Sequence, residues 1–200
     1  MAVERLDTVT RQEQIKKAVL EIISTEGIGK LSTRNLASKI GVTEGALFRH
    51  FSSKKEIMLS ILGDVKSELL ADQEKITYSA SLTAEQKLFN FLCAHIKYLI
   101  ENKGITILLF SEAAHMNDSQ LKKGLREILL TQKENISRII KQGINEGVWD
   151  KSLNVENVAT LYMGIPISLN IEMILEPGIV KQEKFCERMI NLIKRALEKK

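Results

Sequence analysis

Cysteine and proline are scarce in this 200-residue sequence, which contains two of each. Two cysteines without a CxxC spacing suggest neither a disulfide framework nor a zinc motif, so Cys93 and Cys186 are expected to be buried thiols. With so few prolines and many Ala, Leu, Ile, Lys and Glu residues, the composition favours helices over sheets. An apolar content of 44% is that of an ordinary globular protein.

Long apolar runs are also missing from the sequence. The longest candidate, Ile105–Phe110, is far shorter than the roughly 20 residues that a membrane-spanning helix needs. The first residues, MAVERLDTVTRQEQ, are charged and lack the apolar centre of a signal peptide. We therefore expect a cytoplasmic protein with no membrane partner.

The surplus of positive charge lies at the N-terminal end. Residues 1–55 contain ten Lys and Arg against six Asp and Glu, whereas the other 145 residues contain nineteen of each class. A basic segment on a neutral body is typical of a module that faces a polyanion. Mildly basic helices are also common, so charge alone does not identify the partner.

Apolar periodicity and capping residues predict an all-α fold without internal repeats. Residues 1–52 are expected to form a three-helix domain, and residues 53–200 a second helical domain with six further helices. The segment Ile105–Phe110 has the local preference of a buried strand, but no second strand is available to pair with it, so it is predicted as helix. The predicted helices cover about 10–26, 32–40, 43–51, from 53 onward, 83–102, a helix at 105–110, 118–146, 155–175 and 180–197.

Residues 31–51 have the spacing of a helix-turn-helix, in which a tight turn presents the second helix to the major groove of DNA. In the turn Ile40-Gly41-Val42-Thr43, glycine permits a positive φ and Thr43 can cap the second helix. Gly45 and Ala46 are small enough to allow close approach to bases. Helical hairpins with a glycine turn also occur as purely structural elements, so the spacing alone leaves both interpretations open.

The segment LSTRNLASKIGVTEGALFRHFSSKKEIMLSIL, residues 31–62, closely resembles the DNA-binding signature of the TetR family of transcriptional regulators. The signature has a Thr-led helix, an LA…GV turn, a small-residue recognition helix, an aromatic-x-His/Tyr-Phe block and a lysine at the next helix start. The resemblance covers roughly residues 10–65. It implies a dimeric regulator, by family habit a repressor, that binds double-stranded operator DNA and has a helical regulatory and dimerisation domain.

Carried over position by position, the resemblance implies that Thr33 contacts phosphate, Arg34 reaches a guanine edge and Lys54 neutralises phosphate. Glu44 either accepts from cytosine or stabilises the start of its own helix. The family usually has tyrosine at Phe48 and often Thr or Ser at Ala46, so two hydroxyl contacts are lost here. The full set of implied DNA-binding residues is Thr33, Arg34, Thr43, Glu44, Gly45, Ala46, Phe48, His50 and Lys54.

The second domain carries no motif of comparable strength. The resemblance implies that its last two helices, about 155–175 and 180–197, form the homodimer. Apolar residues on them are candidates either for that interface or for the core of the chain itself. They are Leu161, Ile165, Leu169, Met189, Leu192 and Ile193.

A pocket for a small hydrophobic effector is expected in the same domain, because several apolar residues there are interleaved with a few polar ones. Each of these residues could equally belong to an ordinary core. The candidates are Phe89, Leu92, His95, Ile96, Leu108, Phe110, Glu112, Met116, Trp149 and Tyr162. We expect an effector to shift the fourth helix through Met58 and Leu62 and so change the spacing of the two recognition helices.

No catalytic motif such as GxSxG, a P-loop, GxGxxG or HExxH occurs in the sequence, so we expect no enzymatic activity and no cofactor. Glu112 and His115 have a single ExxH spacing, which without a second copy is weak evidence for a metal, and no metal site is predicted. Two other classes stay open: a TetR-like DNA-binding protein controlled by a partner protein or acting architecturally, and a helical adaptor that never binds DNA.

Overall fold

The structure is a computed structural model that describes residues 7–102, 105–176 and 180–198. Within these ranges the chain is helical and contains no strand, which confirms the predicted all-α class. The helices are α1 (Thr8–Glu26), α2 (Thr33–Lys39), α3 (Glu44–Leu47), α4 (Lys54–Val65), α5 (Ala71–Tyr78), α6 (Ala84–Glu101), α7 (Ile105–His115), α8 (Ser119–Asn145), α9 (Val155–Leu175) and α10 (Gln182–Leu197).

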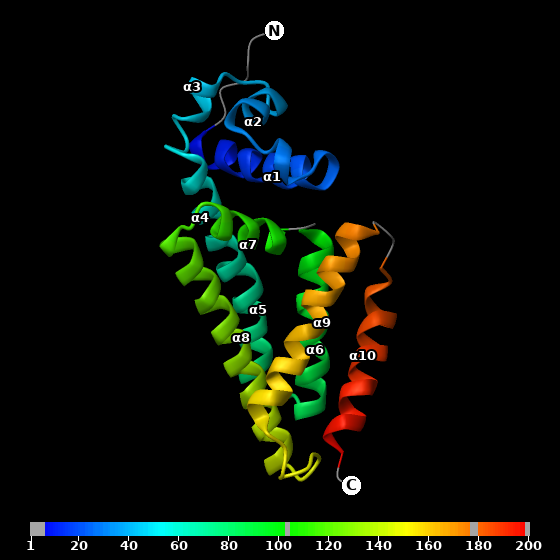
Figure 1. Ribbon diagram of the computed structural model, residues 1–200. Coiled ribbons are helices and arrows are strands. Elements are labelled where there is room, and N and C mark those ends of the chain that lie inside the picture. Colours follow the sequence, from blue (N-terminus) through cyan, green and yellow to red (C-terminus); the bar gives the residue numbers. More distant parts are fainter. Residues whose placement is uncertain (1–6, 103–104, 177–179, 199–200) are drawn as a thin grey trace.

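The molecule has a small head and an elongated helical bundle (Figure 1). Helices α1 to α3 form the head, and α4 leads from the head into the bundle (Figure 1). Helix α7 lies crosswise between the head and the bundle, while α5, α6, α8, α9 and α10 run away from the head (Figure 1). This arrangement makes α4 and α7 the direct connection between the two parts.

Capping residues fix the helix starts of the head. The Ser32 hydroxyl accepts a hydrogen bond from the backbone N–H of Asn35 at 3.1 Å, and the Thr43 hydroxyl accepts from that of Ala46 at 3.1 Å. The Thr43 cap is the predicted one, and the Ser32 cap agrees with a second helix expected to begin at about residue 32. The start of α1 differs from the prediction, because Asp7 caps Thr10 and the helix begins at Thr8.

The fourth predicted helix continues without a break from Lys54 to Tyr78 and contains a π-helical turn at residues 66–70. Such a turn accommodates one extra residue within a helix. It divides the helix into α4 and α5 without changing its direction enough to end it (Figure 1). The nine predicted helices therefore correspond to the α-helices of the structure, with α4 and α5 counted as one.

The hydrophobic core of the head continues into the bundle. One cluster of buried residues joins Ile15 and Leu36 of the head to Leu62 of α4, Leu108 of α7 and Leu121 of α8. A second cluster fills the space between α6, α8, α9 and α10. The division at residues 52 and 53 stays a prediction, since the cluster of the head extends across it.

Helix α9 differs from the expectation drawn from apolar runs. Among the described residues it is one helix that is long and apolar enough to cross a membrane, with a mean hydropathy of 1.5 over its best window, of which 33% is buried. The expectation missed it because Asn, Thr, Gly and Ser interrupt the apolar residues. The helix contacts α6, α7 and α8, and several large apolar side chains on it are exposed.

Candidate nucleic-acid interface

The turn between α2 and α3 is held by the backbone and by the core of the head. Gly41 has a φ of +70°, a conformation that favours glycine, and its N–H donates to the carbonyl oxygen of Ser38. The N–H of Val42 donates to the carbonyl oxygen of Ala37 at 2.9 Å. Because Leu36 and Leu47 are both buried, their helices expose the opposite sides.

The nine residues predicted to contact DNA lie in α2 and α3, close to α3, or at the start of α4, and five of them are exposed. Arg34, Thr43, Glu44, Gly45 and Phe48 are exposed. Thr33, Ala46, His50 and Lys54 are half-buried. The α2–α3 pair lies at the end of the molecule away from the bundle (Figure 1), so a large ligand can approach it. The DNA contacts themselves remain predictions.

Two of the predicted DNA-binding residues contact each other. The Thr33 hydroxyl at the start of α2 donates to the Glu44 carboxylate at the start of α3, with a distance of 2.8 Å. This bond joins the two helix starts and leaves the Thr33 oxygen as an acceptor only. In the unbound protein Glu44 thus has a structural role. This role is similar to the second of the two expected from the sequence, which was to stabilise the start of its own helix.

Two neighbouring lysines at the start of α4 are paired with acids near the junction of α7 and α8. Lys54 Nζ lies 2.9 Å from Glu112 Oε1, and Lys55 Nζ lies 2.7 Å from Asp118 Oδ2. The Lys54 side chain is 31% exposed, whereas that of Glu112 is 6% exposed. The second oxygen of Glu112, Oε2, is buried without a hydrogen-bond partner among the described residues.

Asp118 is also the N-cap of α8 and accepts from the backbone N–H groups of Gln120 and Leu121. Its contact with Lys55 and these backbone bonds hold the pKa of Asp118 below its usual value. The pair with Glu112 was not foreseen, because the sequence predicted Glu112 as a pocket residue and Lys54 as a phosphate contact. Only the three-dimensional arrangement brings positions 54 and 112 together.

The ten predicted pocket residues do not surround one space. Leu108 belongs to the cluster of the head, whereas Leu92, Ile96, Trp149 and Tyr162 belong to the second cluster. Phe110 and Met116 are 49% and 38% exposed, and Phe89 is half-buried. Glu112 faces Lys54. His95 alone of the set lies in a buried polar cluster.

That cluster joins α5, α6 and α8 inside the bundle. Gln132 Nε2 donates to Gln73 Oε1 at 3.0 Å and lies 3.4 Å from His95 Nδ1. Within the described part of the chain, Gln73 Nε2 and Asn135 Nδ2 are buried donors without a partner. Burial lowers the pKa of His95 to about 4, so the cluster consists of neutral groups at neutral pH. Polar residues at apolar positions of the α8 stripe were the sequence signal for it.

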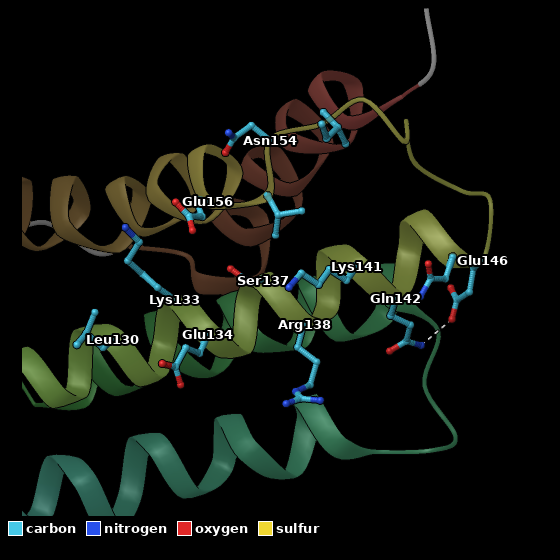
Figure 2. A pocket seen from close by; sticks show the side chains of 13 residues that line it. Leu130, Lys133, Glu134, Ser137, Arg138, Lys141, Gln142, Glu146, Asn154 and Glu156 are labelled. Atoms are coloured by element: carbon cyan, nitrogen blue, oxygen red, sulfur yellow. Dashed lines mark hydrogen bonds between the residues drawn. The ribbon is translucent and has the colours of Figure 1, made fainter.

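A surface groove of about 1340 Å³ lies at the far end of the bundle, between α8 and the beginning of α9. Figure 2 shows Lys133 and Lys141 on α8 on the side toward α9, with Glu156 opposite. Arg138 turns instead toward the end of α5, where its guanidinium lies 5.0 Å from the ring centre of Tyr78. None of the predicted pocket residues lines this groove, whose charges are of both signs.

The six predicted dimer residues fall into two groups. Leu161 and Leu192 are 61% and 58% exposed in the single chain. A residue that a second copy covers is exposed in this way when the chain is alone. Leu169 and Ile193 are buried in the second cluster, and Ile165 and Met189 pack against it. Sequence analysis missed four exposed apolar residues of α9, which are Ile167, Ile171, Ile174 and Leu175.

The chain is similar in sequence to known bacterial proteins, and the family match lies in the head. Residues 15–61 match the family model described as bacterial regulatory proteins, tetR family. The chain is 26% identical over 141 residues to the nucleoid occlusion factor SlmA of Vibrio cholerae, covering 67% of this chain and 68% of that protein. It is 23% identical over 151 residues to the fatty acid metabolism regulator protein of Bacillus subtilis, covering 76% and 77%.

The fold as a whole has solved counterparts. The crystal structure of the TetR family transcriptional regulator PfmR from Thermus thermophilus is similar with a TM-score of 0.76 and 24% identity. That similarity covers 92% of this chain and 99% of the other. The resemblance of the head to the TetR family is confirmed by the family model, and the whole chain has the fold of TetR-family transcriptional regulators.

Proposed function

We propose that the chain is a homodimeric repressor that binds a palindromic operator through α2 and α3 and is released by a small, mostly apolar effector. The observation that carries the proposal is the geometry of the turn and of α3 in the head. A four-residue helix, capped by Thr43 and preceded by the positive-φ Gly41, exposes its first turn at the end of the molecule. Free N–H groups and small side chains at such a helix start suit the major groove.

The DNA contacts divide into two kinds. Arg34 is exposed, so its guanidinium is available to a guanine edge. Lys54 is available to phosphate only when it leaves Glu112. Selection of bound duplexes from a random pool tests the proposal, which predicts enrichment of a two-fold symmetric site. A pool that stays random after several rounds contradicts it.

The exposed apolar side of α9 supports the dimer. Leu161, Ile167, Ile171, Ile174 and Leu175 on α9, with Leu192 on α10, form a set of large exposed apolar residues. A set of this kind usually needs a partner, and two-fold dimers pair the same surface of both copies.

The dimer is tested by one charged substitution and a matched control. Ile171→Lys on α9 should convert the dimer to monomers in sedimentation velocity. Leu130→Lys on α8, at a residue that is 45% exposed against 46% for Ile171, should leave the dimer intact. Equal effects of the two variants, or no monomer from either, would place the interface elsewhere.

The buried polar cluster of His95, Gln73 and Gln132 supports an effector site in the bundle. Each buried donor without a partner costs about 1–3 kcal/mol, and a ligand that accepts from Gln73 or Asn135 removes this cost. Since the cluster is neutral, an uncharged carbonyl on an apolar chain fits better than a free carboxylate. A relative named as a fatty acid metabolism regulator is consistent with an acyl compound as effector.

The effector proposal is tested with two probes that differ in charge. Ethyl octanoate should raise the melting temperature of the protein and weaken its binding to the selected duplex, and octanoate should do so much less. His95→Leu removes the ring nitrogen from the cluster and should abolish the difference between the probes. An ester that changes neither melting nor DNA binding contradicts an acyl ester as the effector.

The contact between α4 and α8 supports transmission from the bundle to the head. A Cβ atom at Gly124 of α8 would lie 2.3 Å from Leu62 Cδ2 of α4, which shows how closely the two helices approach. Met58 and Leu62 are both buried in the cluster that extends into the head. A ligand that moves α8 by a fraction of an ångström therefore displaces α4, because packed cores transmit such shifts.

A second candidate function is DNA binding controlled by a partner protein or used architecturally, without a small effector. It is favoured by the relatives named nucleoid occlusion factors. Mass spectrometry of the purified protein under native conditions separates the two. A bound molecule of a few hundred daltons supports the effector, and its absence together with no response to the probes favours the second candidate.

A further inference from the structure

The two cysteines of the chain, about 90 residues apart in the sequence, meet where α6 packs against α10. Cys93 on α6 is half-buried and Cys186 on α10 is fully buried. Cys93 packs against the cluster that contains Cys186, and each thiol shifts the pKa of the other, so the two side chains are neighbours. The expectation of two buried thiols is therefore correct for Cys186 only, and it missed that the pair is in contact.

A second contact fixes the same two helices at this point. Gln182 Nε2, in the first turn of α10, donates to the backbone carbonyl oxygen of Cys93 at 3.1 Å. Gln182 lies four residues before Cys186 and therefore on the same face of the helix. A disulfide needs Cα atoms within about 7 Å, and neighbouring cysteines on two helices that pack against each other reach this geometry with little movement.

The proximity of the two thiols also affects their ionisation. The neighbouring thiol of Cys93 lowers the pKa of Cys186, because its S–H stabilises the thiolate, and the presence of Cys186 raises the pKa of Cys93. The first proton of the pair is thus lost more readily than the second. Because the thiolate is the species that reacts with peroxides, the pair has one favoured nucleophile and one thiol to resolve it.

We propose that Cys93 and Cys186 are an oxidisable pair that hydroperoxides convert into a disulfide between α6 and α10. The thiolate of one cysteine attacks the peroxide oxygen, the O–O bond breaks, and a sulfenic acid and an alcohol or water form. The sulfur of the other cysteine then displaces the sulfenic hydroxyl, which leaves as water when the S–S bond forms. Two thiols are oxidised and one hydroperoxide is reduced.

The disulfide would link the core of the bundle to a helix of the proposed dimer surface. Leu192, which is 58% exposed, lies on α10 with Cys186, so the bond restricts the helix that carries it. In a reducing compartment such bonds are usually transient and serve to sense oxidants. The inference does not depend on DNA binding or on an effector, since it rests on the two cysteines and their surroundings at the α6–α10 contact.

The experiment treats the full-length reduced protein with hydrogen peroxide and measures its intact mass under denaturing conditions. We expect a loss of two hydrogen atoms, a cross-linked peptide containing positions 93 and 186, and full reversal by dithiothreitol. Oxygen addition to either cysteine without the cross-link, or covalent dimers as the main product, would overturn the proposal.

The melting temperature supplies an independent measurement. A bond that closes a loop of this length should raise it by about 10 °C, and dithiothreitol should reverse the rise. Cys93→Ser, at the half-buried position, should show no rise and should retain oxygen on Cys186 after peroxide. A cross-linked protein that melts at a lower temperature than the reduced one would show that native packing does not align the sulfur atoms.

Discussion

The ion pair between Lys54 and Glu112 makes an asymmetric prediction about stability. Removing the lysine charge with Lys54→Met leaves a carboxylate whose side chain is 6% exposed and whose Oε2 already lacks a partner among the described residues. Removing the acidic charge with Glu112→Gln leaves a lysine that is 31% exposed and can turn toward water. The two substitutions break the same contact, but only Lys54→Met leaves a buried charge, that of Glu112, without a partner.

An unpaired buried charge costs about 3–5 kcal/mol, whereas an exposed pair contributes about 1 kcal/mol or less. We therefore expect Lys54→Met to lower the free energy of unfolding by about 3 kcal/mol and Glu112→Gln by about 1 kcal/mol. The double variant Lys54→Met with Glu112→Gln should be close to Glu112→Gln alone, because no charge is then left inside. The coupling energy between the two positions should thus be about 3 kcal/mol.

Urea unfolding at neutral pH, followed by circular dichroism, measures these differences. Lys75→Met is the control, because the pair of Lys75 with Asp72 is 77% and 66% exposed and should contribute almost nothing. If Lys54→Met is no more destabilising than Glu112→Gln, the Glu112 carboxylate is not a buried unpaired charge in the variant, and the expected asymmetry is wrong. The double variant also keeps the fold while it removes Lys54, so its DNA affinity reports on the phosphate contact.

Two further predictions concern packing and pH. Gly143→Ala should destabilise the protein by about 3 kcal/mol in urea unfolding, because the added Cβ would lie 2.1 Å from the ring of buried Trp149. Gly164→Ala is the control and should be neutral or stabilising, because an added Cβ there has no atom within 4 Å. His95 has a pKa of about 4 in the folded state, below its ordinary value of 6.5, so the unfolded chain binds more protons between these pH values. The contribution of neutral His95 to the free energy of unfolding should be complete above pH 6.5 and lost toward pH 4, a fall of about 3 kcal/mol. Urea unfolding of His95→Leu at different pH values should lack this fall. Identical pH profiles for the variant and the wild type would contradict the burial of His95.

The sequence predicted most of the helices and the helix-turn-helix, because both depend on local signals. Ser32, Thr43 and Asn154 cap helices where capping chemistry places them, and Gly41 has the expected positive φ. The start of α1 was less certain, because Asp7 and Thr10 are both good capping residues three positions apart. The π-helical turn had no sequence signal that a periodic pattern could detect.

Contacts between distant segments could not be predicted in the same way. Lys54 and Glu112, or Cys93 and Cys186, are ordinary residues in their own helices, and only packing brings each pair together. The predicted pocket was dispersed for a related reason. Apolar residues with polar neighbours occur on every helix of a bundle, and their spacing does not tell which helix faces which.

The central claim is that Arg34 on the exposed side of the head reads bases in an operator. The most direct measurement is the ratio of affinities for the selected palindrome and a scrambled duplex, for the wild type and for Arg34→Ala at the same salt concentration. Loss of one good base contact should reduce this ratio about 5- to 150-fold, while Arg188→Ala on α10 should leave it unchanged. A ratio that is the same for Arg34→Ala and the wild type, or no preference for the palindrome in either, would contradict the account.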